Sequence, residues 1–260
     1  MTTKTRLALA SIATCLLIGC GGGGGGGSTS KPIALQSGLI HWWKFNGDAV
    51  DSIGSLSSTP IGPVAYTTAP TGQAIVFNGS TTGISLPAIT DMQFQASFSI
   101  SAWAKLASYP TNSQIAAKII FEGDDRPGLD PFDMGVQPDG TFEFLTTGSN
   151  EVASVGSNSA FPLNTWVFVT GTYDKVAGIQ SLYINGLPEN ERLSVFNLTP
   201  TVPLSNSGFP GIGIGTNNGF PHSAYNEAWN GAISDIRVYN RAITPAEVQA
   251  LYTNGKAGMP

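Results

Sequence analysis

Cysteine is scarce in this chain of 260 residues. The two cysteines are Cys15 and Cys20, and Cys15 lies inside an apolar N-terminal stretch that we expect to be removed. The mature chain would then keep one cysteine, so no internal disulfide can form and the fold must depend on its core. A chain of this length buries about 70% or more of its unfolded surface, which is enough without covalent cross-links.

Charged residues are also few, at 11% of the sequence. Without residues 1–19, which include Lys4 and Arg6, ten basic side chains stand against 17 acidic ones, and the net charge is near −7. A surface of this sign repels phosphate backbones, so we expect no nucleic-acid partner.

Several well-known catalytic motifs are missing. The sequence has no His-Glu-x-x-His zinc helix, no P-loop and no Gly-x-Ser-x-Gly nucleophile elbow. The glycine-rich run 211–215 lacks the following helix of a nucleotide-binding loop, so it predicts a closely packed strand. These absences favour a protein that is not an enzyme.

The N-terminus carries a pattern typical of export. Residues 7–18 are a twelve-residue apolar stretch, too short to span a bilayer but suited to a secretory signal. Leu17-Ile18-Gly19-Cys20 then matches the bacterial lipobox, in which the bond before the cysteine is cut and its thiol is lipidated. We therefore expect a lipoprotein signal peptide at 1–19 and lipidation of Cys20; a plain signal peptide with an accidental cysteine is the alternative.

Residues 20–35 follow as a Gly/Ser-rich segment that we expect to be a flexible tether. No Asp follows Cys20, and resemblance to Gram-negative sorting rules then favours a lipid anchor in the outer membrane, facing the periplasm or the cell surface.

The remaining residues, 36–258, indicate one all-β domain. Glycine (32) and proline (17) are plentiful, which suits short strands joined by tight turns. Residues 98–106 alternate, with Phe98 and Ile100 on one face and Ser99 and Trp103 on the other. Asn185-Gly186 is a strong hairpin signal.

A strand, a turn and a helix are predicted together in residues 229–255. Ile236 and Val238 have the period of a half-buried strand, and the phase of Ile233 predicts a bulge near its start. Thr244 and Glu247 have the spacing of a capping box, with Ile243 and Val248 placed for a hydrophobic staple. Asn254-Gly255 predicts a left-handed helix stop.

This run resembles the closing motif of bacterial laminin-G-like, concanavalin A-like jelly-roll domains, although Ser234 stands where many relatives carry an acidic residue. Residues 38–55 and 72–87 resemble the opening strand and second hairpin of the same family. The matching residues of the closing motif are Gly231, Ile233, Asp235, Arg237, Tyr239, Asn240, Arg241, Ala242 and Glu247.

The resemblance implies a two-sheet antiparallel jelly-roll sandwich with one short C-terminal helix. It also implies that the first and last strands are neighbours, so residues 41–45 should pair near residues 232–239. The expected core is Trp43 or Trp42, Phe45, Phe77, Ile100, Val167, Val169, Ile184, Ile236 and Val238.

Calcium is the expected cofactor, as a structural ion. Asn46, Asp48 and Asp51 offer oxygen ligands in the opening loop. Related jelly-rolls commonly hold calcium between this loop and the closing strand, so the resemblance adds Asp235 to the predicted metal set of Asp48, Asp51 and Asp235. The alternative is that Asp48 and Asp51 only fix turns by hydrogen bonds to the backbone.

A second acidic cluster invites comparison with an active site. Retaining glycosidases of this architecture resemble one another in a Glu-x-Asp-x-x-Glu strand with carboxylates about 5 Å apart, whereas the run 122–127 here ends in Pro127. Carboxylates this dense repel one another, so either a cation sits among them or the loop stays solvated, and Lys118 and Arg126 can neutralise part of their charge. The cluster consists of Glu122, Asp124, Asp125, Asp130 and Asp133.

Ligand recognition is expected in the loop 216–230. Phe220, His222 and Tyr225 stand among amide side chains, a mixture that stacks on a sugar ring and bonds its hydroxyls, although packing of a surface loop is the alternative. We expect a membrane-anchored, non-catalytic binding module for a carbohydrate or an extracellular protein ligand. A glycan hydrolase or lyase with an unrecognised site, and an adhesive or structural surface lipoprotein, are the alternatives.

Overall fold

Strands make up most of the structure, which is a computed structural model. It describes residues 35–87, 96–111, 116–122, 132–147, 152–193, 211–216 and 228–257. The predicted signal peptide, Cys20 and almost all of the tether lie outside these ranges. Within the described part of the chain, no helix has the length and apolar character needed to cross a bilayer.

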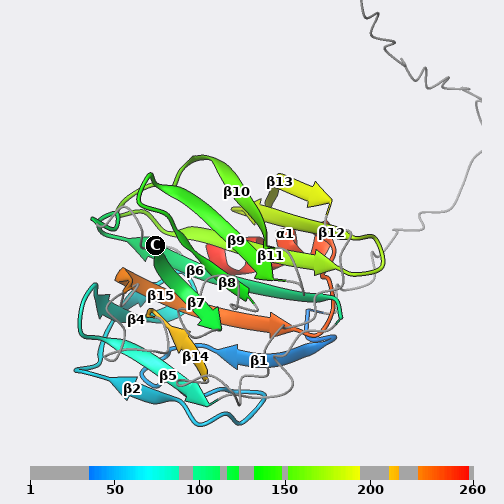
Figure 1. Cartoon of the computed structure of the whole chain (residues 1–260). Coiled ribbons are helices and arrows are strands. Elements are labelled where there is room, and N and C mark those ends of the chain that lie inside the picture. Colours follow the sequence, from blue (N-terminus) through cyan, green and yellow to red (C-terminus); the bar gives the residue numbers. More distant parts are fainter. Residues whose placement is uncertain are drawn as a thin grey trace, which may run out of the picture. The chain divides into compact units, whose positions relative to one another are not determined.

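The described strands form two antiparallel sheets, stacked as a sandwich (Figure 1). One sheet has eight strands: β1 (Leu39–Trp43), β3 (Ala65–Ala69), β4 (Gly72–Asn78), β6 (Phe98–Leu106), β11 (Val167–Asp174), β12 (Ile179–Ile184), β13 (Leu187–Leu193) and β15 (Asn230–Tyr239). The other has seven: β2 (Thr59–Ile61), β5 (Gly83–Pro87), β7 (Ala117–Glu122), β8 (Phe132–Val136), β9 (Thr141–Thr147), β10 (Val152–Ala160) and β14 (Gly211–Ile214). The helix α1 (Pro245–Lys256) follows β15. This confirms the all-β jelly-roll sandwich with one C-terminal helix.

The sandwich core agrees closely with the expectation. Trp43, not Trp42, is the buried member of its pair, and Ile184 is only partly buried. Asn185 and Gly186 turn the β12–β13 hairpin with φ of 51° and 80°, the left-handed pair that a two-residue hairpin requires. The other expected core residues, all buried, are Phe45, Phe77, Ile100, Val167, Val169, Ile236 and Val238.

The strand β15 joins distant parts of the eight-stranded sheet. It pairs with β6 on one side, and on the other with β4 through residues 230–233 and with β1 through residues 236–239. The predicted pairing of the first and last strands is therefore confirmed. The bulge is displaced from the predicted position: the register with β6 shifts between Ser234 and Arg237, where Asp235 has φ of 53°, while Ile233 is an ordinary core residue.

Both faces of β6 are buried, although its sequence alternates. Ser99, Ser101 and Trp103 face away from the sandwich core yet are fully buried. The reason is α1, which packs on the outer face of this sheet and makes a second apolar cluster there. This cluster contains Leu39, Trp103, Phe168, Tyr183, Tyr239, Ile243, Val248 and Leu251.

The start of α1 follows the sequence prediction, but its end does not. Thr244 is the N-cap of a capping box with Glu247, and Ile243 and Val248 are buried in one cluster, as a hydrophobic staple requires. The predicted left-handed stop at Asn254-Gly255 is wrong, because the helix continues to Lys256. Gly255 instead allows close packing: a Cβ there would lie 2.4 Å from Nε1 of Trp103.

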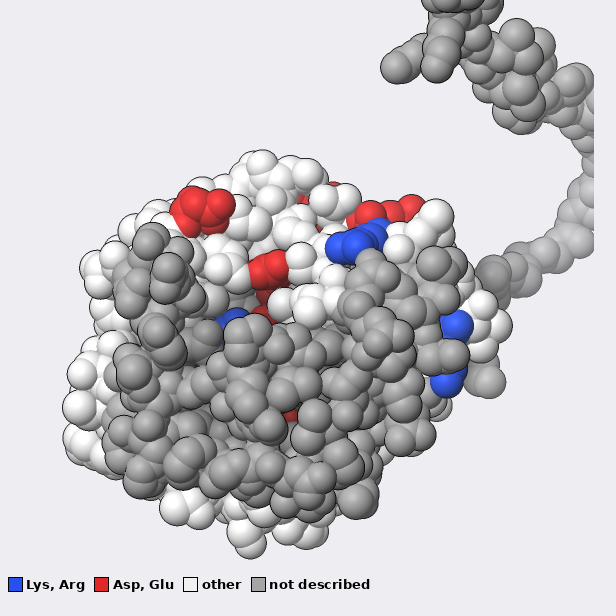
Figure 2. Space-filling view, viewed as in Figure 1, with Lys and Arg blue, Asp and Glu red and all other residues white. Residues whose placement is uncertain are grey.

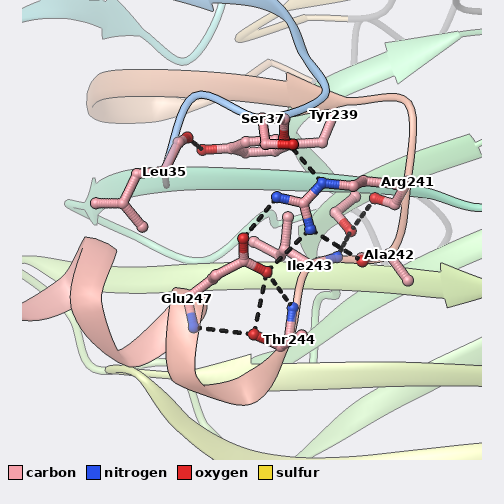
Figure 3. Close-up of polar contacts among 9 residues, drawn as sticks. Leu35, Ser37, Tyr239, Arg241, Ala242, Ile243, Thr244 and Glu247 are labelled. Atoms are coloured by element: carbon pink, nitrogen blue, oxygen red, sulfur yellow. Dashed lines mark hydrogen bonds and ion pairs between the residues drawn. The ribbon is translucent and has the colours of Figure 1, made fainter. Parts of the chain in front are cut away.

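A clamp of hydrogen bonds ties the first described residues to the end of β15 (Figure 3). We call Leu35, Ser37, Tyr239, Arg241 and Glu247 the Arg241 clamp. Arg241 donates from Nε to the Ser37 carbonyl at 2.8 Å, and from Nη1 and Nη2 to Glu247 at 2.9 and 2.6 Å. The Tyr239 hydroxyl donates to the Leu35 carbonyl at 3.0 Å. The Arg241 hydrogen bond lowers the pKa of Glu247 to about 2, against the opposing effect of burial.

Candidate binding site

The site is built from side chains that β1 turns away from the core. His41 and Trp43 are buried, whereas Trp42 and Lys44 alternate with them and are only partly buried. Trp42 packs beside the outer apolar cluster under α1. Trp42 is therefore placed at a surface, where its ring and its indole N–H remain available to polar groups.

The bulge in β15 brings Asp235 to the Trp42 ring. At this point β15 passes from pairing with β4 to pairing with β1, and the left-handed residue changes the direction of its side chain. Oδ1 of Asp235 accepts from Nε1 of Trp42 at 2.5 Å and from Nε of Arg237 at 3.0 Å. Burial raises the pKa of Asp235, and the nearby Arg237 charge opposes this rise.

A cavity of ≈ 390 Å³ lies beside this carboxylate, and we call it the Trp42 pocket. Its walls come from β1 and the residues after it, the turn between β3 and β4, the bulge of β15, and the last turns of α1. The lining residues are Trp42, Lys44, Asn46, Thr71, Asp235, Arg237, Leu251, Asn254 and Gly255.

Two cations flank the same ring in this pocket. Nζ of Lys44 lies 4.2 Å and Cζ of Arg237 lies 4.3 Å from the centre of the Trp42 ring, both within cation–π range. Among the described residues, the Arg237 guanidinium makes one hydrogen bond of good geometry, from Nε to Asp235, and it also lies near the Tyr239 phenol. Lys44 has no hydrogen bond to any described residue. The pocket therefore holds donors that the fold does not use.

The predicted metal residues do not come together in the described part of the chain. Asp51 is buried, and its two oxygens accept from Nδ1 of His41 at 2.7 Å and from the amides of Trp42, Ile53 and Leu56 at 2.9, 3.1 and 3.4 Å. Burial would raise the pKa of Asp51, but these hydrogen bonds, first that of His41, hold it well below its usual range.

Asp48 accepts from the Val50 amide, and Asp235 belongs to the Trp42 pocket. No group of three or more His, Cys, Asp or Glu side chains suited to a metal occurs among the described residues. The acceptor positions of Asp51 are filled by N–H donors, so its geometry does not fit a calcium ligand and agrees with the turn-fixing alternative. Calcium binding stays a prediction, which a fall in melting temperature on chelation would support.

The predicted sugar-binding residues Phe220, His222 and Tyr225 lie outside the described residues.

Of the acidic cluster, Glu122 and Asp133 are described and both are buried. Lys118 donates to Asp133 at 2.8 Å, as its predicted neutralising role requires. On the face shown in Figure 2, the described charged side chains form small separate patches.

Sequence reasoning missed Lys44, Thr71, Arg237 and Asn254 as site residues. The alternation of β1 places Trp42 and Lys44 on the face opposite Trp43, and this signal could have found these two lining residues. The other residues join it only through the pairing Trp42↔Arg237 and the packing of α1.

Three comparisons with known proteins bear on this arrangement. Residues 78–249 match the family model described as the concanavalin A-like lectin/glucanases superfamily. No curated protein matches the chain. Domain 4 of AbnA, a GH43 extracellular arabinanase from Geobacillus stearothermophilus solved in complex with arabinotriose, is similar with 23% identity and a TM-score of 0.61 over 82% of this chain and 98% of that one.

Toxin binding domains are similar as well. The binding domain of Paraclostridial Mosquitocidal Protein 1 has 15% identity and a TM-score of 0.65 over 84% of this chain and 52% of that one. A structure of botulinum neurotoxin type C, whose cell entry depends on two ganglioside molecules, has 18% identity and a TM-score of 0.63 over 85% and 52%. The chain thus spans about half of the length of these toxin domains, and at these identities the likeness shows the fold alone.

Proposed function

The chain belongs to the concanavalin A-like lectin/glucanases superfamily, and from this premise we propose that it is a non-catalytic carbohydrate-binding module whose ligand lies in the Trp42 pocket. The observation that carries the proposal is the pocket itself. Its volume of ≈ 390 Å³ is within the usual range of roughly 300 to 1,000 Å³ for small-ligand sites.

The lining suits a polyhydroxylated ligand. Asn46 and Asn254 carry amides that donate and accept, Thr71 carries a hydroxyl, and Lys44 adds donors that no described residue uses. Trp42 and Leu251 supply the apolar part of the lining, and the Lys44 and Arg237 cations lie over the Trp42 ring. The glycans named with the similar structures, arabinotriose and ganglioside, support a ligand of this class.

The pocket argues against hydrolysis at this place. Both stereochemical classes of glycosidase use two carboxyl groups, about 5 Å apart or roughly 6.5 to 9.5 Å apart. Among the described residues, Asp235 is the one carboxylate that lines the Trp42 pocket, and its Oδ1 already accepts two hydrogen bonds. A single engaged carboxylate cannot serve as both acid and nucleophile or base, so binding is the function that this lining supports.

Asn254→Trp tests the pocket by filling its mouth. Asn254 is exposed in α1 and its side chain makes no hydrogen bond to another described residue, so a larger side chain should leave the fold intact. We expect the full chain, purified in detergent, to bind members of a glycan array, and the variant to bind them at least about tenfold more weakly. Ala246→Trp, at an exposed position of the same helix outside the pocket, is the matched control.

Failure of the chain to bind any glycan would overturn the proposed function. Equal binding by wild type and Asn254→Trp would retain a glycan-binding module but remove the Trp42 pocket as its site.

The membrane anchor belongs to the same proposal. We propose that Cys20 is lipidated after removal of residues 1–19, and that it holds the module at the outer membrane, toward the periplasm or the cell surface. The lipobox 17–20 and the following Gly/Ser-rich segment support this. Cys20→Ser should move the protein from the membrane fraction to the soluble fraction. Wild-type protein with a free Cys20 thiol would reject the anchor.

A further inference from the structure

We infer that the group held in the Trp42 pocket is the carboxylate of an acidic sugar, such as a uronic acid. This inference rests on the proposed function and names the chemical class of its ligand. It starts from the charges of the pocket, which differ in sign from those of the protein as a whole.

The described lining residues include two cations and one carboxylate: Lys44, Arg237 and Asp235. This described lining is therefore positive by one charge, whereas the chain has a formal net charge of −5. Oδ1 of Asp235 is engaged within the fold, because this buried side chain accepts there from the indole N–H and from Nε of Arg237. One excess positive charge matches one ligand carboxylate.

The Trp42 ring fixes where these cations lie. It keeps the Lys44 ammonium and the Arg237 guanidinium each within 4.3 Å of its centre, and its N–H orients the carboxylate that holds Nε of Arg237. With Nε held in this way, Nη1 and Nη2 form the other edge of the guanidinium, near the Tyr239 phenol, and make no further hydrogen bond of good geometry to a described residue. Two parallel N–H groups of arginine match the two oxygens of a carboxylate, and the Lys44 ammonium adds a third charged donor.

The neutral groups of the pocket then have a different task. Asn46, Thr71 and Asn254 stand around the cations, where amides and hydroxyls bond the ring hydroxyls that accompany the carboxylate in an acidic sugar. A simple anion would use only the cations. The combination of charged and neutral donors therefore favours a sugar acid over a free inorganic anion.

The experiment compares sugars that differ only in charge. The full chain in detergent is titrated with oligosaccharides of galacturonate, glucuronate and mannuronate, with the carboxyl-reduced form of each, and with sulfated neutral oligosaccharides. We expect one uronate series to bind at least about tenfold more tightly than its reduced form, the factor that about one charge-assisted hydrogen bond supplies. Binding should weaken as salt increases.

Lys44→Gln and Arg237→Gln test the residues. Each should reduce the preference for the charged ligand, while Lys256→Gln, a change of an exposed cation on α1 outside the pocket, should not. Melting curves of the variants separate loss of binding from loss of fold, and Lys44→Gln keeps the test valid if Arg237→Gln unfolds the protein.

Each other outcome has a distinct meaning. Equal binding of charged and reduced sugars, lost in Asn254→Trp, overturns this inference and leaves the proposed function standing. Tighter binding of the sulfated sugars also overturns it, as does a uronate preference that both Lys44→Gln and Arg237→Gln leave unchanged. Absence of binding to every sugar overturns the proposed function and this inference with it.

Discussion

Two arginine–carboxylate pairs lie close together near the end of the chain and are built differently. In the Arg241 clamp, all three guanidinium nitrogens donate, to Ser37, Ala242 and Glu247. In the Trp42 pocket, Arg237 donates from Nε to Asp235 and presents its remaining nitrogens near the cavity. The same residue types thus form a pair in which every guanidinium nitrogen donates in the clamp, and a pair with one hydrogen bond of good geometry in the pocket.

The two carboxylates respond in opposite directions. The hydrogen bond from Arg241 lowers the pKa of Glu247 to about 2, whereas burial raises the pKa of Asp235 despite the neighbouring Arg237. The pKa of Glu247 is set mainly by its hydrogen bond to Arg241, and the pKa of Asp235 is set mainly by desolvation. The number of guanidinium nitrogens that donate within the fold, and not the presence of an arginine beside an acid, distinguishes the Arg241 clamp from the Trp42 pocket.

The largest expected effect is that of Arg241→Ala. It removes the bidentate pair with Glu247 and the bond to the Ser37 carbonyl, and it leaves the partly buried Glu247 without its cation. We expect the free energy of unfolding to fall by about 2 to 3 kcal/mol, measured by denaturant titration. A loss below about 0.5 kcal/mol would show that the clamp does not stabilise the fold.

Acid should weaken the clamp but not the pocket. The pKa of Glu247 is 4.5 as a reference and about 2 when folded, so its contribution is complete above about pH 5 and is lost as the pH falls toward 2. We expect this loss to be roughly 2 kcal/mol after allowance for solvent screening, and Glu247→Gln to remove it from the pH profile of stability.

Asp235 contributes with the opposite sign, because its raised pKa favours the protonated form in the folded state. Asp235→Asn should therefore leave the acid loss as steep as in wild type or make it steeper. A flattened profile in Asp235→Asn would contradict the distinction between the two pairs. Asp51, whose pKa is also lowered, adds an acid-sensitive part to every variant.

The smallest effects come from exchanging arginine for lysine at both positions. Lysine keeps the charge but lacks the planar fork, so Arg241→Lys should cost about 1 kcal/mol of stability. Arg237→Lys should cost less, about 0.5 kcal/mol, because the Arg237 guanidinium makes one hydrogen bond of good geometry to a described residue, from Nε to Asp235, yet the exchange should weaken ligand binding. Equal stability losses in the two variants would remove the proposed difference.

Sequence predicted the clamp region better than the pocket because its signals are local. The capping box depends on Thr244 and Glu247, three residues apart, and the periodicity around Ile236 needs only the neighbouring residues. The stop at Gly255 failed because packing against Trp103, a residue far away in the sequence, overrides a local turn signal. The bulge was predicted at the wrong residue. Periodicity shows that the alternation of buried and exposed residues changes along the strand, but not at which residue the register with the neighbouring strand shifts.

The pocket was missed for a different reason. Its walls come from four segments, around residues 42–46, 71, 235–237 and 251–255, and only the paired sheet and the packed helix bring them together. The adjacent Trp42 and Trp43 could not be assigned to a face from sequence alone. The carboxylate of Asp51 suggested a metal ligand from sequence. In the structure its oxygens accept hydrogen bonds instead, one of them from His41, ten residues earlier in the chain.

The position of β15 has a consequence for how the chain reaches its native state. It is the last strand along the chain, yet it lies inside the eight-stranded sheet between β6 and β4 (Figure 1). Contacts such as that between Trp42 and Asp235 join residues 193 positions apart. While residues 230–239 are still inside the ribosome, β1, β4 and β6 lack their common partner. This sheet can therefore be completed only after β15 has left the ribosome, and a topology with such distant contacts is expected to fold slowly.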